Sequence, residues 1–282
     1  MAGVPTDIVD GQRRRVPVSK LLGRGGEGSV YEITNEPNIA AKIYFPDKAL
    51  ARKEKILAMV QARLHVGAAS VAYPMGPLYH SNGNFAGFTM QKVGQRRPVH
   101  ELYSPSSRRQ QFKKGNFPFL VRAALNVATS MSAVHESGCV IGDVNHSGIL
   151  ISQDAVASLI DADSFQFQFQ GRTYRCAVGV ADFTPPELQG GRLDRVDRTM
   201  NHDAFGLAVM VFQLLFMGRH PFVGGFLPGG TCQWRKRSQS VASLIRLTAV
   251  ELEWKRRLMY RHSKTFLQIW QKRLKSLFLP NP

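Results

Sequence analysis

The sequence contains few cysteines and no long apolar run. Its three cysteines, Cys139, Cys176 and Cys232, lie far apart and form no CxxC pair, which argues against a zinc knuckle or a disulfide framework. No segment reaches the roughly 18 consecutive apolar residues that a membrane span needs. The first residues, MAGVPTDIVDGQRRRV, have no apolar core like that of a signal peptide. These absences favour a cytoplasmic protein.

Acidic residues are also scarce. The chain has 20 Asp and Glu against 37 Lys and Arg, which gives a formal net charge of +17. Such a charge is found in proteins that bind nucleic acid, anionic membranes or phosphate-bearing ligands. Residues 231–282 hold 12 basic and 2 acidic residues, and therefore +10 of the +17. This basic tail could complete a helical lobe, dock a partner, lie loosely attached or bind nucleic acid.

The order of the predicted elements divides the chain into a small β-rich part and a larger helical part. In the first part the patterns predict strands at 16–23, 28–34 and 38–45, a helix at 46–64, and a hairpin of 76–80 with 87–93. A polar, basic connector follows at 95–115. In the second part they predict a helix at 119–135, short strands at 148–152 and 156–161, and a helix at 203–216. With 282 residues the chain is long enough for two lobes.

A glycine-rich stretch, LLGRGGEGSVYEI, lies between the first two strands. Gly23, Gly25 and Gly28 form a GxGxxG pattern, and Val30 follows two residues later. Glycines let the backbone approach phosphates closely and aim its N–H groups at them. A dinucleotide-binding fold would need a helix at the third glycine, whereas the residues after Gly28 favour a strand. Taken alone, the stretch could also be a plain turn.

A lysine inside an apolar strand follows in the segment IAAKIY. Lys42 loses hydration in such a strand, so its charge needs a partner unless the side chain reaches solvent at a sheet edge. Glu54 lies twelve residues later on the predicted helix and could be that partner. It would serve an ordinary surface helix equally well.

Three carboxylates follow in the second part of the chain. Asp143 comes after an apolar pair and a glycine and precedes a short strand. Asp161 and Asp163 come directly after the strand VASLI and are two residues apart. In an extended segment this spacing points both side chains the same way, so both could reach one cation. A polar turn after a buried strand is the alternative.

In order and spacing these motifs resemble a divergent bacterial Ser/Thr protein kinase domain. The resemblance extends over residues 20–222, near 70% of the chain. FTPPEL is similar to the A-P-E triplet, and the stretch from Asp203 to Phe222 is similar to the central C-lobe helix with the G-x-x-P-F segment after it. In the family Asp203 would brace the catalytic loop, although it could also be a helix cap. The resemblance implies an α+β, bilobal fold with an N-lobe at 1–94, a C-lobe at 95–230 and the tail at 231–282.

The resemblance also implies a role for each candidate site residue. Gly23, Gly25, Gly28 and Val30 would cover the phosphates of ATP, and Lys42, held by Glu54, would contact them. Met90 would line the adenine pocket, and Gln91 to Val93 would form the hinge. Asp143 would orient the attacking hydroxyl as a catalytic residue. Asp161, 13 residues after Gly148, would be the main Mg²⁺ ligand, with Asn145 and Asp163 as further candidates.

Three departures from the family pattern qualify the implied activity, and one of them is Asn145 in the place of the usual lysine. Ile141 and Gly142 replace the His and Arg of the catalytic loop, so we expect no dependence on activation-loop phosphorylation. Gly148 replaces the metal-binding asparagine, which leaves a nucleotide-binding pseudokinase as the alternative to an enzyme.

The implied reaction is transfer of the γ-phosphoryl group from ATP to Ser or Thr of a protein, with Mg²⁺ or Mn²⁺. Some kinases of this kind are encoded beside PP2C-type phosphatases and von Willebrand A-domain proteins in tellurite-resistance or stress clusters, and both are expected as partners. Nucleic-acid binding through the basic tail is a second alternative.

Overall fold

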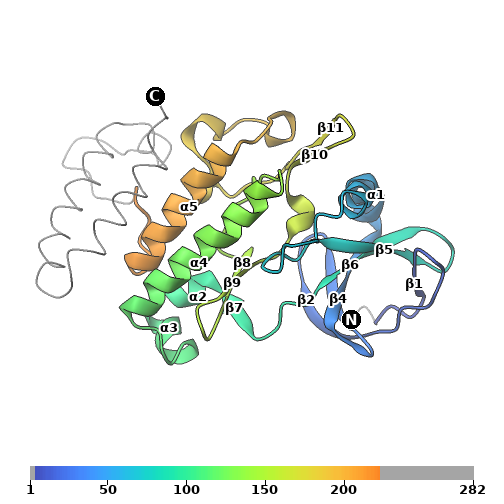
Figure 1. Cartoon of the computed structure of the whole chain (residues 1–282), viewed down its shortest axis with the longest axis horizontal. Helices are drawn as coiled ribbons and strands as arrows, with labels where there is room; N and C mark the ends of the chain where they lie inside the picture. The colour runs from blue at the N-terminus through green and yellow to red at the C-terminus, as the bar shows by residue number, and fades with distance from the viewer. Residues whose placement is uncertain (1–3, 223–282) are drawn as a thin grey trace, which may run out of the picture.

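The computed structural model describes residues 4–222 and shows two lobes (Figure 1). A curled antiparallel sheet with one helix forms the N-lobe, and helices dominate the C-lobe. This arrangement confirms the expected α+β, bilobal fold. The basic tail, 231–282, and the helices predicted in it lie outside the described residues.

The N-lobe contains a six-stranded sheet and helix α1 (Pro46–Gln61). The strands are β1 (Ile8–Asp10), β2 (Val18–Arg24), β3 (Gly28–Ile33), β4 (Glu36–Tyr44), β5 (Pro74–His80) and β6 (Phe85–Gln91). Their order in the sheet is β1-β5-β6-β4-β3-β2, and all neighbours are antiparallel. The predicted strands and the β5–β6 hairpin are confirmed, whereas β1 was not predicted.

Strand β4 contacts two different apolar clusters because its side chains alternate between the faces of the sheet. Ala41 and Ile43 join the small outer core of the N-lobe. Tyr44 instead joins the main core, together with Ile56 and Met59 of α1. Lys42, which is also buried, is two residues from Tyr44 and so shares its face, toward the interlobe side. The alternation thus places a lysine between the sheet and the C-lobe.

The C-lobe consists of helices and short strands. Its helices are α2 (Val99–Tyr103), α3 (Pro105–Gln111), α4 (Phe117–Glu136) and α5 (Met200–Leu215). Its strands are β7 (Arg96–Pro98), β8 (Ile149–Ser152), β9 (Ala157–Leu159), β10 (Phe167–Phe169) and β11 (Arg172–Tyr174). Single 3₁₀ turns are η1 (Ala162–Ser164), η2 (Ala181–Phe183), η3 (Pro186–Leu188) and η4 (Leu193–Arg195). The connector expected at 95–115 therefore contains β7, α2 and α3; β7 exists because it pairs with β8.

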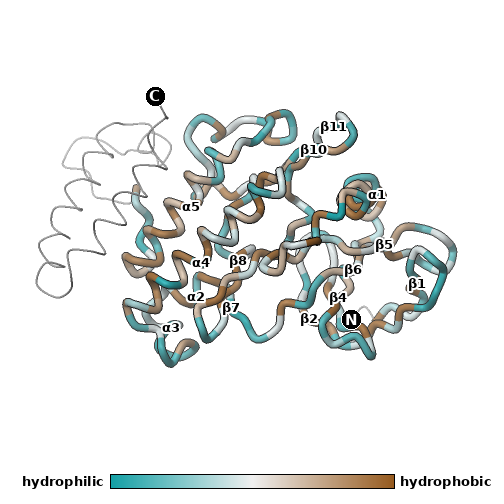
Figure 2. Tube along the Cα trace, viewed as in Figure 1, coloured by the Kyte–Doolittle hydropathy of each residue, from teal (hydrophilic) through white to brown (hydrophobic). Residues whose placement is uncertain are grey.

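Helix α4 is the central helix of the C-lobe. The Asn116 side chain caps its start by accepting a hydrogen bond of 3.1 Å from the Phe119 N–H. Hydrophobic residues recur along α4 and α5 (Figure 2), and Leu120, Val127 and Met131 of α4 are buried in the main core. Among the described helices only α4 is long and apolar enough to cross a membrane, a property that core helices share.

Candidate active site

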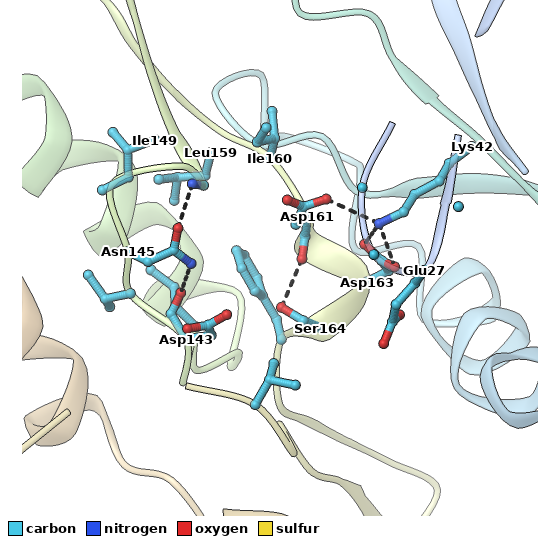
Figure 3. A pocket seen from close by; sticks show the side chains of 18 of the residues that line it. Glu27, Lys42, Asp143, Asn145, Ile149, Leu159, Ile160, Asp161, Asp163 and Ser164 are labelled. Carbon is cyan, nitrogen blue, oxygen red and sulfur yellow. Dashed lines mark hydrogen bonds and ion pairs between the residues drawn. The ribbon is translucent and has the colours of Figure 1, made fainter. Parts of the chain in front are cut away.

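A cleft of about 280 Å³ lies where the glycine loop, β4, the loop before β8 and the segment after β9 meet (Figure 3). It brings together eight of the residues singled out in the sequence, namely Gly25, Gly28, Val30, Lys42, Asp143, Asn145, Asp161 and Asp163. Of the other described candidates, Gly23, Glu54, Met90, Gln91 and Val93 do not line it. Met90 lies inside β6, where it pairs with Ala40, and Gln91 is exposed at the end of that strand.

Lys42 is bound by both aspartates of the segment after β9. Its Nζ lies 2.8 and 2.9 Å from the two carboxylate oxygens of Asp163 and 3.1 Å from Oδ1 of Asp161 (Figure 3). Burial alone would lower the pKa of Lys42, but the two carboxylates outweigh it and raise the pKa. The lysine is therefore held as a cation in the cleft.

Asp163 is the buried partner in this arrangement. Its side chain is only 4% exposed, and the Tyr44 hydroxyl donates a hydrogen bond of 2.6 Å to its Oδ2. Burial alone would raise the pKa of Asp163, but Lys42 and the Tyr44 hydroxyl outweigh it and hold the pKa below its usual value. Both oxygens of Asp163 are thus committed to β4, and its predicted role as a metal ligand finds no support in this geometry.

The expected pair between Lys42 and Glu54 is not formed. Glu54 is bonded to Arg172 of β11, its carboxylate lies 3.5 Å from the Tyr174 hydroxyl, and its side chain is 60% exposed. The cause is the helical rotation of about 100° per residue, which turns Glu54 outward while Arg52 and Lys55, three positions apart, share the inner face. Asp163 takes the place that was predicted for Glu54.

Arg52 connects α1 to the glycine loop. Its Nε lies 2.9 Å from Oε2 of Glu27, and its Nη2 bonds the other carboxylate oxygen. Both residues line the cleft. A two-pronged guanidinium–carboxylate contact of this kind restricts orientation more than a single bond does. It therefore sets the position of the loop tip relative to α1.

Lys55, the other inward cation of α1, is buried. Its Nζ donates to the carbonyl oxygens of Ser164 at 2.8 Å and Arg175 at 3.0 Å. Burial lowers the pKa of Lys55 to about 8. These contacts join α1 to the segment that carries Asp161 and to the chain after β11.

Asp161 begins the turn η1 in a left-handed conformation, with φ at 59° and ψ at 31°. Its carbonyl accepts hydrogen bonds from the N–H of Ser164 at 3.0 Å and from the Ser164 hydroxyl at 2.9 Å. Its side chain is 60% exposed, and its Oδ1 makes the 3.1 Å contact with Lys42. The carboxylate is thus presented to the cleft by a turn that is closed behind it.

Asp143 and Asn145 lie on the opposite side of the cleft from Lys42 (Figure 3). Asp143 Oδ1 is buried and has no hydrogen-bond partner in the part of the chain that the structure describes, and burial raises the pKa of this carboxyl. Asn145 Oδ1 accepts from the N–H groups of Ser147 at 2.8 Å and Gly148 at 2.9 Å. The amide oxygen that was predicted to bind metal therefore shapes the loop.

Asp203 braces this loop from α5, as the kinase resemblance implies. Its two oxygens accept from the N–H groups of Ile141 at 2.7 Å and Gly142 at 2.8 Å, and His135 Nε2 lies 2.9 Å away. The helix is capped instead by Thr199, in a capping box with His202, so α5 begins earlier than predicted. The bracing role of Asp203 is confirmed, and the cap alternative is wrong.

Gly142 stands where the family has an arginine, and the structure gives the reason. Its φ is +71°, and an added Cβ would lie 2.6 Å from Cys176 Cβ. Arg198 bridges the same region by donating to the carbonyls of Gly142 at 2.7 Å and Val178 at 3.1 Å. The loop that carries Asp143 is thus held against the chain after β11 by close packing and a buried guanidinium.

The cleft has open space next to the glycine loop and carboxylates beside that space. An added Cβ at Gly23 would meet nothing within 4 Å and one at Gly25 only a contact at 4.0 Å, so space is open above the loop, whereas Gly28 is required because its Cβ would lie 2.3 Å from the Ile43 carbonyl. Asp161, whose side chain is 60% exposed, and Asp143 both line this cleft. Carboxylates together with phosphate oxygens are the usual ligands of Mg²⁺.

Two known proteins are similar in sequence to this chain, although no protein-family model matches it. The chain is 42% identical over 211 residues to Protein kinase YegI of Escherichia coli O157:H7, covering 74% of this chain and 33% of the relative. It is 42% identical over 209 residues to Protein kinase YegI of strain K12, covering 73% and 32%. The chain thus spans about a third of the length of the curated relatives it matches.

The described part of the chain has a bilobal, protein-kinase-like fold. Four residues at or near its cleft were missed in the sequence, namely Tyr44, Arg52, Lys55 and Arg198. Two of them had a local signal, since Tyr44 follows Lys42 at the strand period of two, and Lys55 precedes Met59 at the helical spacing of four. For Arg52 and Arg198 the partners are distant in sequence, and no local pattern indicates them.

Proposed function

We propose that this domain transfers the γ-phosphoryl group of ATP, with Mg²⁺, to a Ser or Thr hydroxyl of a protein. The observation that carries the proposal is the meeting of Lys42, Asp143 and Asp161 in one cleft under a glycine loop with open space. The names of the two related proteins support phosphoryl transfer in general. The choice of Ser or Thr rests on the sequence resemblance.

Binding of the nucleotide would use the loop and the lysine. The backbone N–H groups near Gly25 would face the phosphates, and Lys42, kept charged by Asp163, would contact them. Asp161 would hold the Mg²⁺, which when bound neutralises charge on the phosphates. Asn145 and Asp163 stay predicted ligands whose oxygens are engaged elsewhere in this arrangement. Binding of ATP with Mg²⁺ would therefore depend on Lys42 and Asp161 more than on other residues of the cleft.

Proton transfer would use Asp143. In the reaction the hydroxyl oxygen of the substrate forms a bond to the γ-phosphorus, the bond from that phosphorus to the β–γ bridging oxygen breaks, and ADP leaves. The hydroxyl proton passes to Asp143, whose Oδ1 has no other partner among residues 4–222. The raised pKa of this carboxyl makes it a better proton acceptor than an ordinary aspartate.

Activity independent of activation-loop phosphorylation is part of the proposal. The family arginine that would bind a phosphorylated loop is replaced by Gly142. Arg198, the buried guanidinium nearby, already donates to two backbone carbonyls. The loop after β11 is therefore held by bonds that need no phosphate.

The proposal is tested with the full chain, radiolabelled ATP and MgCl₂, with the chain itself and a general protein acceptor as substrates. Asp143→Asn should lower phosphate incorporation by about 10³-fold or more, because positioning and proton transfer are both lost. Asp154→Asn, a change at an exposed aspartate of the β8–β9 turn, should leave it unchanged. Phosphoamino-acid analysis should find phosphoserine or phosphothreonine. Equal incorporation by the wild type and Asp143→Asn would overturn the proposal.

A pseudokinase is the second candidate, and a specific observation favours it. Gly148 offers no ligand oxygen in its side chain, and the oxygen of Asn145 is used by the backbone. Such a protein would bind ATP without incorporating phosphate. Titration of ATP with and without Mg²⁺, followed by calorimetry and combined with the incorporation assay, separates the two functions. Cytoplasmic location and the phosphatase and A-domain partners stay predictions.

A further inference from the structure

Lys55 is a buried cation whose contacts are to backbone rather than to a carboxylate. Its residue exposure is 8%, and its Nζ donates to the carbonyls of Ser164 and Arg175. Within residues 4–222 it takes part in no ion pair. Burial of an ammonium group without a counter-charge costs free energy. A methylene-rich apolar residue would fill the same position on the buried face of α1 at a lower cost in free energy. The ammonium group is therefore expected to have a role beyond packing.

The first contact of Lys55 reaches the turn that presents the aspartates. Ser164, whose carbonyl accepts the 2.8 Å bond, closes this turn through its own N–H and hydroxyl, both bonded to the Asp161 carbonyl. Asp163, inside the turn, holds Lys42. A displacement of Ser164 would therefore move Asp161, to whose carbonyl Ser164 is bonded, more than Asp163, which the Tyr44 hydroxyl of β4 also holds.

The second contact reaches the chain that packs on the catalytic loop. Arg175, whose carbonyl accepts the 3.0 Å bond, directly precedes Cys176. Cys176 is buried and lies so close to Gly142 that no Cβ would fit between them. Gly142 in turn directly precedes Asp143. One ammonium group thus joins α1 to the supports of both Asp161 and Asp143.

We propose that Lys55 is a positioning residue for phosphoryl transfer, which fixes the turn of Asp161 and the chain around Cys176 relative to helix α1. The proposal rests on the proposed function and adds a contact between the helix and the site that Glu54 does not make. Lys42 is held by Asp163, which in turn accepts from the Tyr44 hydroxyl, and neither residue belongs to α1. Loss of Lys55 therefore disturbs the Mg²⁺-dependent part of the site and spares the contact of Lys42 with phosphate.

The kinetic test compares Lys55→Met and Lys55→Arg with Lys53→Met. Lys53 is on the same helix and makes no hydrogen bond or ion pair with any described residue, so it is a matched control. Lys55→Met should lower kcat by about 10- to 100-fold, the usual effect of a small misplacement of reacting groups. It should also raise the Mg²⁺ concentration at half-maximal rate, while ATP binding without Mg²⁺ stays within about twofold of wild type, because phosphate charge is still met by Lys42. Lys55→Arg should restore most of the rate, and Lys53→Met should match wild type.

A structural test makes the inference independent of turnover. Amide hydrogen exchange, followed by mass spectrometry, should become faster in Lys55→Met in two segments, 161–166 and 174–178, and nowhere else outside α1. If Lys55→Met loses its cooperative unfolding transition, Lys55→Gln replaces it with the same expected results. Unchanged exchange in both segments would overturn the inference, as would wild-type kcat and Mg²⁺ dependence. A wild type without activity would contradict the proposed function, and exchange would still decide the role of Lys55.

Discussion

Helix α1 and the segment from Asp161 to Phe165 carry opposite charges. The helix brings Arg52 to the cleft and Lys55 to the Ser164 carbonyl, and the segment presents Asp161 and Asp163 to the cleft. The kinase resemblance assigns the carboxylate that holds Lys42 to the helix, but the structure places it in the segment. What the lysine requires is a buried carboxylate at its Nζ, and either element can supply one.

Burial separates the two carboxylates that compete for this role. The Asp163 side chain is 4% exposed and bonded on both oxygens, whereas that of Glu54 is 60% exposed. An exposed ion pair contributes about 0–1 kcal/mol to stability, while removing one partner of a buried pair costs about 3–5 kcal/mol. Exchanging each carboxylate for its amide therefore tests which of the two holds Lys42.

The largest effect is expected for Asp163→Asn. The change leaves the buried Lys42 with Asp161, at 3.1 Å, as its only carboxylate partner among residues 4–222, so the free energy of unfolding should fall by about 3–5 kcal/mol. Phosphate incorporation should fall as well, because Lys42 loses its orientation. Urea unfolding and the incorporation assay measure both effects.

Glu54→Gln is the matched control for this change. It removes an exposed carboxylate from α1 and should change the free energy of unfolding by less than about 1 kcal/mol, with activity near wild type. A larger effect for Glu54→Gln than for Asp163→Asn would mean that the helix, and not the segment, supplies the carboxylate that holds Lys42.

A smaller effect is expected in the pH dependence of stability, which depends on the buried ammonium group of Lys55 in α1. The pKa of Lys55 is lowered from 10.5 to about 8 by burial, with Cys176, Asp163 and Glu27 acting in the opposite direction and Arg52 in the same. The unfolded chain therefore binds more protons between these two values, and stability rises with pH in that window.

The expected gain is about 3 kcal/mol between about pH 8 and 10.5, and it should be absent in Lys55→Met. Urea unfolding of both proteins at several pH values gives the difference, in which groups common to both cancel. Parallel pH profiles for the two proteins would show that Lys55 is not a buried cation.

The smallest effect is expected for Gly148→Asn. This change asks whether the loop that carries Asp143, like the segment from Asp161 to Phe165, can supply an oxygen ligand to Mg²⁺. A Cβ at Gly148 would lie 3.6 Å from the Asn145 amide nitrogen and 3.8 Å from the Ile160 carbonyl, both ordinary contacts. Gly148→Asn should therefore be accommodated and add one oxygen for Mg²⁺.

The Mg²⁺ concentration at half-maximal rate should fall roughly threefold in Gly148→Asn, as one oxygen ligand is gained. Gly148→Ala adds the Cβ alone and should stay at the wild-type value. Equal behaviour of the two variants would mean that the loop does not face the metal.

Most of the N-lobe and the long helices were predictable from local pattern. Strands β2 to β6 and helices α1, α4 and α5 have residues that recur at periods of 2 or 3.6, which depend only on nearby residues. The meeting of Lys42, Asp143 and Asp161 in one cleft was also predictable, because the resemblance preserves their order and spacing. Strand β1 and strand β7 were not, since each has three residues and exists through pairing with a distant strand.

Only the tertiary structure decided the partners of the charged residues. Along the sequence Glu54 and Lys55 are neighbours, and the rotation of the helix against its buried face turns one out and the other in. Asp163 meets Lys42 across 121 positions, and Arg198 meets Gly142 across 56. The local pattern determines which residues carry charge and which element they belong to. Burial then decides which charges meet, because a buried ion is tolerated only where the fold brings it a partner.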